Sequence, residues 1–297
     1  MKDALKRDGS PGPVAVAVCA DPAGDGDLAR AASRIAGELG LPLLKRPFAK
    51  GYELLLVAAP GRLELRVVGG DLALKGVRPV WVNLEEVDTV SGAGRSFKQP
   101  IAKAVGLRGK KDSPVTVIDA TAGWGKDAWL LASLGCRVLA VERSSVVAVL
   151  LKDGLLRAGT RSPQTLERLS VLAADSRDLL RRIAQAGQGS SVEGLPEEAQ
   201  GFVRPDVVYL DPMFAGAERR KTAEKYPMRV LRRLVGADGD ARELFDCAMQ
   251  AAGRRVVVKR PAKGSMDFGV KPVATHQGKG FCFDVYPVLA VKASEGP

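Results

Sequence analysis

The stretch "VTVIDATAGWGKDAWLLASLGCRVLAVE", residues 115–142, decides the fold of the larger part of this chain. Its first apolar run ends at Asp119 and its second ends at Glu142, as buried strands do. Between these runs, Gly123 and Gly125 open the segment "GKDAWLLASLG", which has the pattern of a helix. The stretch therefore predicts one strand–helix–strand unit with a glycine turn after its first strand.

The same alternation continues toward the C-terminus. Further strands are expected at "LSVLAAD", "DVVYLD", "RRVVVKRP" and "FCFDVYPVLA", and further helices at "SSVVAVLLKDGLLRAG" and "SRDLLRRIAQAG". A basic region of helical pattern follows "DVVYLD", and residues 187–204 are expected to form an exposed loop. Repeated units of this kind predict an α/β fold of the Rossmann-like class, an open and mostly parallel sheet with helices on both faces.

Residues 1–90 predict a small N-terminal α/β domain. A strand is expected at 14–20, a helix in "GDLARAASRIAGELG" with Gly40 as its stop, a hairpin turned at Pro60-Gly61, and a strand at "PVWVNL". Residues 91–114 form a basic junction, and residues 115–297 form the second domain. The junction is either a solvated linker or a nucleic-acid contact through Arg95, Lys98, Lys103, Arg108, Lys110 and Lys111.

Composition limits the class of protein. The chain has 297 residues, of which 46% are hydrophobic, so it can bury a sizeable core and is not disordered throughout. Its 45 Lys and Arg exceed its 34 Asp and Glu, for a formal net charge of +11. Such a surplus favours an anionic partner, with nucleic acid first and a membrane surface second, although a solvated basic surface would also explain it.

Cysteine and histidine usage disfavours metal and triad chemistry. Four cysteines, Cys19, Cys136, Cys247 and Cys282, lie scattered along the chain and predict reduced thiols in a cytoplasm. The single histidine, His276, makes a His-based triad or a zinc site a poor prediction, so we expect no metal. The N-terminus lacks the pattern of a signal peptide, and no apolar run reaches the ~18 residues of a membrane span. We therefore expect a cytoplasmic protein with no membrane partner.

The glycine turn and Glu142 together predict a nucleoside-containing ligand. Glu142 follows Gly125 by 17 residues, at the end of the next strand, where a carboxylate can accept hydrogen bonds from ribose hydroxyls. A dinucleotide is one alternative, but Asp127 at the helix start would repel its pyrophosphate. The same acid suits a ligand with a cationic amino group, such as S-adenosylmethionine (SAM). A purely structural turn is the third alternative.

Two more strand ends carry acids. Asp175 ends "LSVLAAD", where it could accept a hydrogen bond from an adenine amino group beside Ser176, or cap the helix that follows. Asp211 ends "DVVYLD" in the stretch "VVYLDPMFAG" (207–216), and its strand is expected to lie beside the strand that ends at Asp119.

The motif after Asp211 suits transfer to a base amino group. Asp211 and the carbonyl of Pro212 could accept the amino hydrogens and so direct the nitrogen lone pair, while Phe214 could stack on an extruded base. Asp211, Pro212 and Phe214 are thus the predicted catalytic residues. A capping aspartate followed by a core phenylalanine is the alternative.

A basic run follows this motif directly. The segment "ERRKTAEKYPMRVLRRL" (218–234) holds seven Lys or Arg against two Glu. Its place beside the expected base site favours phosphate contacts over a solvated helix face. The predicted RNA-binding residues, including two from "RRVVVKRP", are Arg219, Arg220, Lys221, Arg229, Arg232, Arg233, Lys259 and Arg260.

The combination of "DATAGWGKDAWLLASLGCRVLAVER", "VVYLDPMF", "EKYPMRVLRRLVG" and "RVVVKRP" resembles the RsmJ family. The resemblance covers residues 90–286 well and the first 90 residues loosely. It implies a class I SAM-dependent methyltransferase that modifies guanine N2 in small-subunit (16S) ribosomal RNA. SAM would then be the cofactor, and the rRNA or the 30S particle the partner.

The resemblance also implies positions for the cofactor. They fall on Lys126 and Asp127, on Glu142 and Arg143, on Asp175 and Ser176, and on Asp211. The family often has Arg at the position of Lys126 and Ser at that of Asp175. With the residues argued above, the expected cofactor-binding set is Asp119, Gly123, Gly125, Lys126, Asp127, Glu142, Arg143, Asp175, Ser176 and Asp211.

Three other functions fit parts of the sequence. A nicotinamide-dependent oxidoreductase could use the glycine turn, but the basic surface and the lack of a suitably placed histidine count against it. A non-catalytic RNA-binding or ribosome-assembly protein could retain the fold, although the intact acids and DPMF motif argue otherwise. A methyltransferase acting on DNA or on a protein side chain would keep the same chemistry.

Overall fold

A computed structural model describes residues 14–47, 50–73, 78–107, 114–189, 191–212, 225–236, 239–263 and 266–288. Contacts divide the chain into an N-terminal unit, residues 1–82 with 222–236, and a large unit, residues 83–221 with 237–297. The domain bounds predicted from the sequence at residues 90 and 114 remain a proposal about which parts fold independently. Phe214, Arg219, Arg220 and Lys221 lie outside the described residues, as do Arg108, Lys110 and Lys111.

The large unit is built on one sheet, whose described strands run in the order β10-β11-β9-β8-β5-β6-β7. The strands β7, β6, β5, β8 and β9 pair in parallel, whereas β11 is antiparallel to both β9 and β10. The predicted open and mostly parallel sheet is therefore confirmed. These strands are β5 (Thr116–Asp119), β6 (Arg137–Glu142), β7 (Leu169–Ala173), β8 (Val207–Leu210), β9 (Arg255–Pro261), β10 (Ala274–Gln277) and β11 (Phe281–Pro287).

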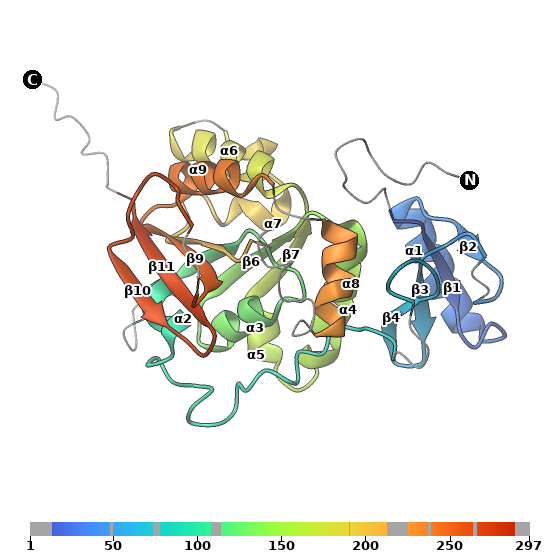
Figure 1. The fold of residues 1–297 in the computed structure, drawn as a ribbon. Helices are drawn as coiled ribbons and strands as arrows, with labels where there is room; N and C mark the ends of the chain where they lie inside the picture. The colour runs from blue at the N-terminus through green and yellow to red at the C-terminus, as the bar shows by residue number, and fades with distance from the viewer. Residues whose placement is uncertain are drawn as a thin grey trace, which may run out of the picture. The chain divides into compact units, whose positions relative to one another are not determined.

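Helices cover both faces of this sheet, as predicted (Figure 1). One face packs against α6, α7 and α9, which contribute Leu180, Ala199 and Phe245 to a shared apolar core, and the other face carries α3 and α4. The helices of this unit are α2 (Pro100–Val105), α3 (Lys126–Ser133), α4 (Ser145–Gly159), α5 (Pro163–Leu166), α6 (Ser176–Gly187), the 3-10 helix η1 (Val192–Gly194), α7 (Glu197–Gln200) and α9 (Ala241–Ala251).

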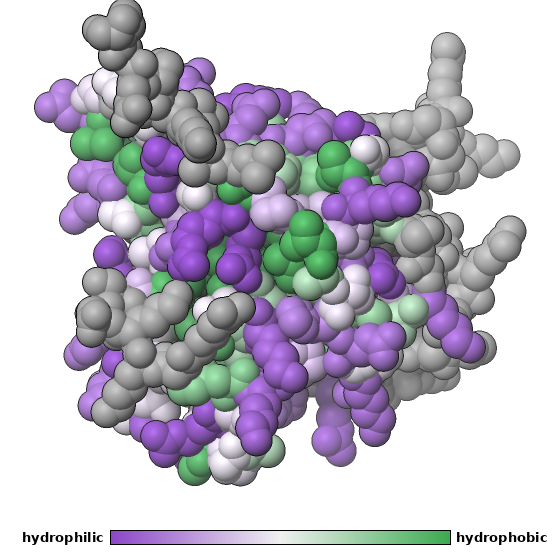
Figure 2. Space-filling model, turned by 90° about the vertical axis from the view of Figure 1, so that its left-hand side faces the viewer, coloured by the Kyte–Doolittle hydropathy of each residue, from purple (hydrophilic) through white to green (hydrophobic). Residues whose placement is uncertain are grey.

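The outer strand β10 is polar on its exposed side. Thr275 and Gln277 alternate with less exposed residues along it. On the side of β10 and β11 the surface is mostly hydrophilic, and its green groups are separated by purple ones (Figure 2). An edge strand of this composition is a poor template for pairing with another chain.

Two sequence-based expectations were wrong. Residues 187–204 are not simply an exposed loop, because they form the short helices η1 and α7. Their residues Leu195, Ala199 and Phe202 are buried in the core. The spacing of these three residues is helical, but the surrounding Gly, Ser and Glu residues obscured it. Residues 79–84 form no regular strand; they make one isolated bridge, Leu65 with Val80, although Val82 and Leu84 are buried in the expected alternation.

The N-terminal unit contains the predicted strand, helix and hairpin. Its sheet has the order β2-β1-β3-β4, with β1 parallel to β2 and β3, and with β3 and β4 joined as the antiparallel hairpin at Pro60-Gly61. The Asp25 side chain caps α1, which ends at Gly40 in the left-handed conformation (φ 62°). The elements are β1 (Val16–Ala20), α1 (Gly26–Leu39), β2 (Leu43–Leu44), β3 (Leu54–Ala59), β4 (Arg62–Val67) and α8 (Tyr226–Val235).

Candidate cofactor and base-binding site

Sheet topology brings the predicted acids to one edge. Strand β5 ends at Asp119 and pairs in parallel with β6, which ends at Glu142, and with β8, which Asp211 follows. The expected neighbour relation between the Asp211 strand and the Asp119 strand is confirmed. Ligands of open α/β sheets bind beyond the carboxyl ends of the strands, so this edge is the candidate site.

The glycine turn is held in a shape that only glycine adopts easily. Gly123 (φ 51°) and Gly125 (φ 71°) both lie in the left-handed region. A Cβ on Gly125 would also lie 2.3 Å from Cδ1 of Leu151 on α4. Gly125 is therefore required by its backbone angle and by the packing of α4, in addition to any contact with a ligand.

Glu142 is fixed by the turn that it faces. Its side chain is buried, with 4% of the residue exposed, and its two oxygens accept the N–H groups of Gly123 at 2.9 Å and of Ser144 at 2.8 Å. These two bonds fix the orientation of the carboxylate. The side chain is thus positioned at the strand end where a ribose acceptor was predicted.

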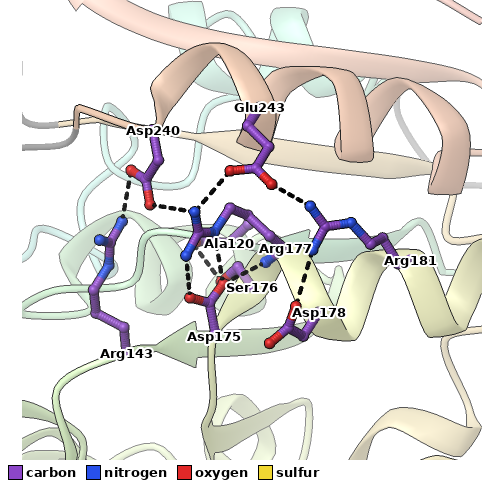
Figure 3. A network of polar contacts seen from close by, with 9 residues as sticks. All are labelled: Ala120, Arg143, Asp175, Ser176, Arg177, Asp178, Arg181, Asp240 and Glu243. Atoms are coloured by element: carbon purple, nitrogen blue, oxygen red, sulfur yellow. Dashed lines mark hydrogen bonds and ion pairs between the residues drawn. The ribbon is translucent and has the colours of Figure 1, made fainter.

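Asp175 caps α6 and is also held by an arginine (Figure 3). Its carboxylate accepts the N–H of Arg177 at 2.9 Å and ion-pairs with the Arg177 guanidinium at 2.7 Å. Hydrogen bonds from the Arg177 side chain lower the pKa of Asp175 to about 2, against the opposing effect of burial. The capping alternative is therefore real, while the adenine contact stays a prediction.

The same arginine ties α6 to the start of α9. Arg177 contacts Asp240 at 3.2 Å and Glu243 at 2.7 Å, and Arg143, after β6, also reaches Asp240 at 3.2 Å (Figure 3). Ser176 donates from its hydroxyl to the carbonyl of Ala120 at 2.7 Å. Two predicted cofactor residues, Arg143 and Ser176, thus also connect the strand ends to their neighbours.

Asp211 and Asp127 share a lysine. The Lys259 ammonium lies 2.7 Å from Oδ2 of Asp127 and 2.9 Å from Oδ2 of Asp211. The Tyr209 hydroxyl donates to the same Asp127 oxygen at 2.7 Å. The backbone N–H of Asp211 donates to the Thr121 hydroxyl at 2.6 Å, which ties β8 to the loop after β5.

Asp119 lies deeper than the other acids. It is 2% exposed, and its carboxylate accepts the N–H of Thr121 at 3.1 Å. Burial, followed by the charge of Asp127, raises the pKa of Asp119 well above its ordinary range. Asp119 is therefore suited to support the loop in its neutral form more than to meet a cationic ligand directly.

The remaining predicted residues lie in several places. Lys126 makes an exposed ion pair with Glu86 at 2.7 Å, and Arg260 pairs with the buried Asp284 at 3.1 Å. Arg229, Arg232 and Arg233 lie on α8, where Arg233 pairs with Glu53 at 2.7 Å. Pro212 is buried directly after Asp211. In the junction, Arg95, Lys98 and Lys103 are exposed.

Three site residues were missed by sequence reasoning: Tyr209, Arg177 and Asp240. Tyr209 is 0% exposed within an otherwise aliphatic strand, and its single hydroxyl was the available signal that a polar partner lies nearby. Arg177 and Asp240 had no comparable signal, because their importance comes from contacts between distant segments.

The residues at this edge fit SAM, which carries a ribose, an adenine, and an amino acid with a cationic ammonium beside a cationic sulfonium. Carboxylates at the ends of β6 and β8 suit such a ligand, whereas they would repel a pyrophosphate. Within the described ranges, no three Cys, His, Asp or Glu side chains gather as metal ligands. A cation, Lys259, contacts Asp127 and Asp211.

Comparison with known proteins identifies the family. A family model described as "Putative SAM-dependent methyltransferase" matches residues 44–288. Ribosomal RNA small subunit methyltransferase J of Chromobacterium violaceum is 41% identical over 278 residues, covering 92% of this chain and 96% of that protein. The chain belongs to the ribosomal RNA small subunit methyltransferase J family. The Vibrio vulnificus member is 46% identical over 200 residues, covering 66% of this chain and 71% of its own.

A crystal structure of a similar protein has the same overall fold. A SAM-dependent methyltransferase from Neisseria gonorrhoeae is 29% identical, has a TM-score of 0.63, and covers 94% of this chain and 99% of its own. The resemblance that the motifs predicted is thereby confirmed, as is SAM as the cofactor of the family. None of the helices in the described ranges combines the length and hydropathy of a membrane span.

Proposed function

We propose that this protein transfers a methyl group from SAM to the N2 amino group of a guanine in small-subunit (16S) rRNA. The observation that carries the proposal is the position of Asp211, at the end of β8 beside the glycine turn after β5, in a chain of this family. The names of the relatives supply the substrate, small-subunit rRNA, and the guanine N2 position follows from the resemblance of the motifs.

The cofactor supplies an electrophilic methyl group on its sulfonium when it is bound. Glu142 would hold the ribose, because two backbone N–H groups already orient its carboxylate. Asp175 and Ser176 would lie on the adenine side, with Arg143 beside them. The acids near the strand ends would favour the cationic part of the ligand over an anionic one.

Asp211 would position the amino group rather than act as a strong base. The lone pair of a base amino group is drawn into the ring, so hydrogen bonds from N2 to Asp211 and to the Pro212 carbonyl would turn that pair toward the methyl group. The proton can leave to solvent after methyl transfer, so the site does not need a strong base. Phe214, outside the described residues, is proposed to stack on the extruded guanine.

The cationic residues after Asp211 are proposed to bind phosphates. The net charge of +11 supports an RNA partner, either free rRNA or a 30S particle. We propose a cytoplasmic location, because the four scattered cysteines suit reduced thiols, and a reaction that needs no metal, because neither these cysteines nor the single histidine has metal-ligand spacing.

The deciding experiment is methyl transfer from labelled SAM to 30S particles or 16S rRNA from a strain that lacks this protein. We expect one guanine to gain the label at N2, and none with Asp211→Ala. Label that appears in protein, in DNA, or at another base atom would refute the proposed substrate. No transfer to any of these acceptors would favour the non-catalytic RNA-binding alternative.

A further inference from the structure

Lys259 projects from β9, the strand beside β8, and reaches carboxylates on two other elements. Its nitrogen lies 2.7 Å from Asp127, in the first turn of α3, and 2.9 Å from Asp211, after β8. The two carboxylate oxygens therefore lie no farther apart than the sum of these distances. Without the ammonium, two like charges would face each other at the proposed reaction site.

The setting of this ammonium differs from that of a surface cation. The Lys259 side chain is 21% exposed, and its nitrogen lies 5.3 Å from the centre of the Phe281 ring, within the range of a cation–π contact. Burial alone lowers the pKa of Lys259, but the charges and hydrogen bonds of Asp127 and Asp211 outweigh burial and raise it. The lysine is therefore cationic throughout the physiological range, and its charge is directed at two acids.

We infer that Lys259 is a positioning residue for methyl transfer: it joins the glycine-turn helix to Asp211 and keeps the Asp211 carboxylate in an accepting state. This inference rests on the proposed function, in which Asp211 accepts hydrogen bonds from the guanine amino group. A protonated carboxyl would be a donor on one oxygen and would lose that ability. Tyr209 supports the arrangement, because its hydroxyl donates to the Asp127 oxygen that also contacts Lys259.

Within the described residues, charged and titratable groups face Asp211 from four packed elements, and they include Asp119 on β5, Asp127 on α3, Tyr209 on β8 and Lys259 on β9. Burial raises the pKa of both Asp119 and Tyr209 well above their ordinary values, which favours the uncharged form of each. Lys259 supplies a positive charge that offsets the Asp127 and Asp211 carboxylates.

A role in stability alone does not account for this placement. Replacing a buried ion pair with apolar residues is often neutral or stabilising, so the pair is weak evidence for a structural role. One partner, Asp211, is 39% exposed and lies at the strand edge where ligands bind. A phosphate contact, the role predicted for Lys259 from its basic neighbourhood, would instead place the ammonium toward solvent.

The test compares Lys259→Met, which removes the charge, with Lys259→Arg, which keeps it. Single-turnover rates at saturating RNA are measured from pH 6 to 9, and RNA affinity is measured across a salt series. We expect the Lys259→Met rate to fall most at pH 6, by at least about twofold, and to recover as the pH rises, because base restores the second carboxylate charge. Lys259→Arg should recover most of the rate, and neither variant should change the salt slope of RNA binding.

A second readout does not depend on activity. Carbon NMR of labelled aspartates follows the carboxyl signal that disappears in Asp211→Asn. In Lys259→Met, that carboxyl should take up its proton at a pH at least about two units higher than in the wild type, which a twofold rate loss at pH 6 requires. Lys259→Gln repeats the measurement if the methionine variant does not fold, because its amide still donates to one carboxylate without the charge.

The control is Arg254→Met. Arg254 lies directly before the first residue of β9, its side chain is half exposed, and it pairs with Asp206. This variant should leave the rate, the pH profile and the NMR signal unchanged. An unmoved Asp211 signal, or a rate loss equal at every pH, would overturn the inference. The inference would also be overturned if Lys259→Met lowered the salt slope of RNA binding by the amount of one phosphate contact and left the rate unchanged, because that is the signature of a phosphate contact. If the wild type methylates no small-subunit RNA while the Asp211 signal still moves, it is the proposed function that fails.

Discussion

At the scale of single residues, the acids of this site differ in burial and therefore in the chemical role that each is suited to. Asp119 is buried and favours its neutral form, Glu142 is buried but oriented by two backbone N–H groups, and Asp211 is partly exposed beside Lys259. Burial without donors disfavours a carboxylate charge, whereas N–H donors and a nearby cation restore it. From this gradation we predict a supporting role for Asp119, a cofactor contact for Glu142 and a substrate contact for Asp211.

Glu142 gives the first prediction at this scale. Glu142→Ala should weaken SAM binding by roughly 1.5–3 kcal/mol for each charged hydrogen bond lost. Calorimetric titration measures the affinity, and thermal unfolding shows whether the protein is folded. Glu142→Gln is the matched control, because its amide oxygen can still accept one N–H from the glycine turn. A folded alanine variant with wild-type affinity would remove Glu142 from the cofactor site.

Asp211 gives the second prediction at the scale of single residues. Asp211→Ala should abolish methyl transfer while RNA affinity stays at the wild-type level, because the phosphate contacts lie elsewhere. Labelled-methyl transfer and filter binding measure the two effects separately. Asp178→Ala removes the same charge from an acid whose side chain is 74% exposed, and it should transfer normally. Near-normal turnover of Asp211→Ala would contradict the mechanism.

At the scale of elements, Asp175 at the start of α6 both caps its own helix and takes part in a network that reaches α9. Asp175 caps the helix and pairs with Arg177, and Arg177 in turn contacts Asp240 and Glu243 at the start of α9 (Figure 3). The cap was among the roles that the sequence left open for Asp175. The arginine network could not be predicted from the sequence, because periodicity in one segment carries no information about which other segment packs against it.

The Asp175 pair predicts an acid-dependent stability. The pKa of Asp175 is lowered to about 2 in the folded protein, below the ordinary value of about 3.9 for an aspartate. The unfolded chain therefore binds this proton more readily, so the stabilisation is complete above about pH 5 and is lost as the pH falls toward 2. Denaturant unfolding of wild type and Asp175→Asn from pH 6 to 2.5 should show a difference that shrinks with acid. A difference that is constant with pH would mean that the Asp175 charge contributes nothing.

The glycine turn gives a prediction about packing. Gly125→Ala should destabilise the large unit by about 2–4 kcal/mol, since it combines a left-handed backbone angle with a Cβ placed 2.3 Å from Leu151. Urea unfolding measures the change. Gly239→Ala is the control, because a Cβ there would meet no atom within 4 Å. Equal stabilities of the two variants would show that α4 yields readily at this contact.

At the scale of the whole molecule, the sequence was informative where the pattern was local. The strands that end at Asp119, Glu142 and Asp211 follow from apolar runs, and their shared edge follows from the parallel topology that repeated units require. Helix α9 was missed although "ARELFDCAMQAA" has helical spacing, because the preceding basic run drew attention to charge. Lys259 was predicted to be an RNA contact, whereas the pairing of β9 with β8 places its side chain beside Asp211.

The surplus of positive charge yields the last prediction. If Arg219 and Arg220 contact phosphates, replacing both with alanine should flatten the log–log salt slope of RNA binding by about 1.4–1.8 units. Arg233→Ala should flatten the salt slope by less than the ~0.7–0.9 units of one phosphate contact. The reason is that Arg233 already pairs with Glu53. The control Arg30→Ala/Arg34→Ala removes the same charge from α1 and should leave the slope unchanged.

Turnover measured alongside filter binding separates the possible outcomes. A flatter slope for Arg219→Ala/Arg220→Ala but not for the α1 control assigns phosphate contacts to the segment after Asp211. Salt slopes that become flatter by the same amount in both double variants would mean that net charge alone attracts the RNA. Unchanged binding with lost transfer would mean that the segment orders the base site, as a lid does, since phosphate contacts would have to change the slope. An unaltered slope with unaltered turnover would leave these arginines with no role in RNA recognition.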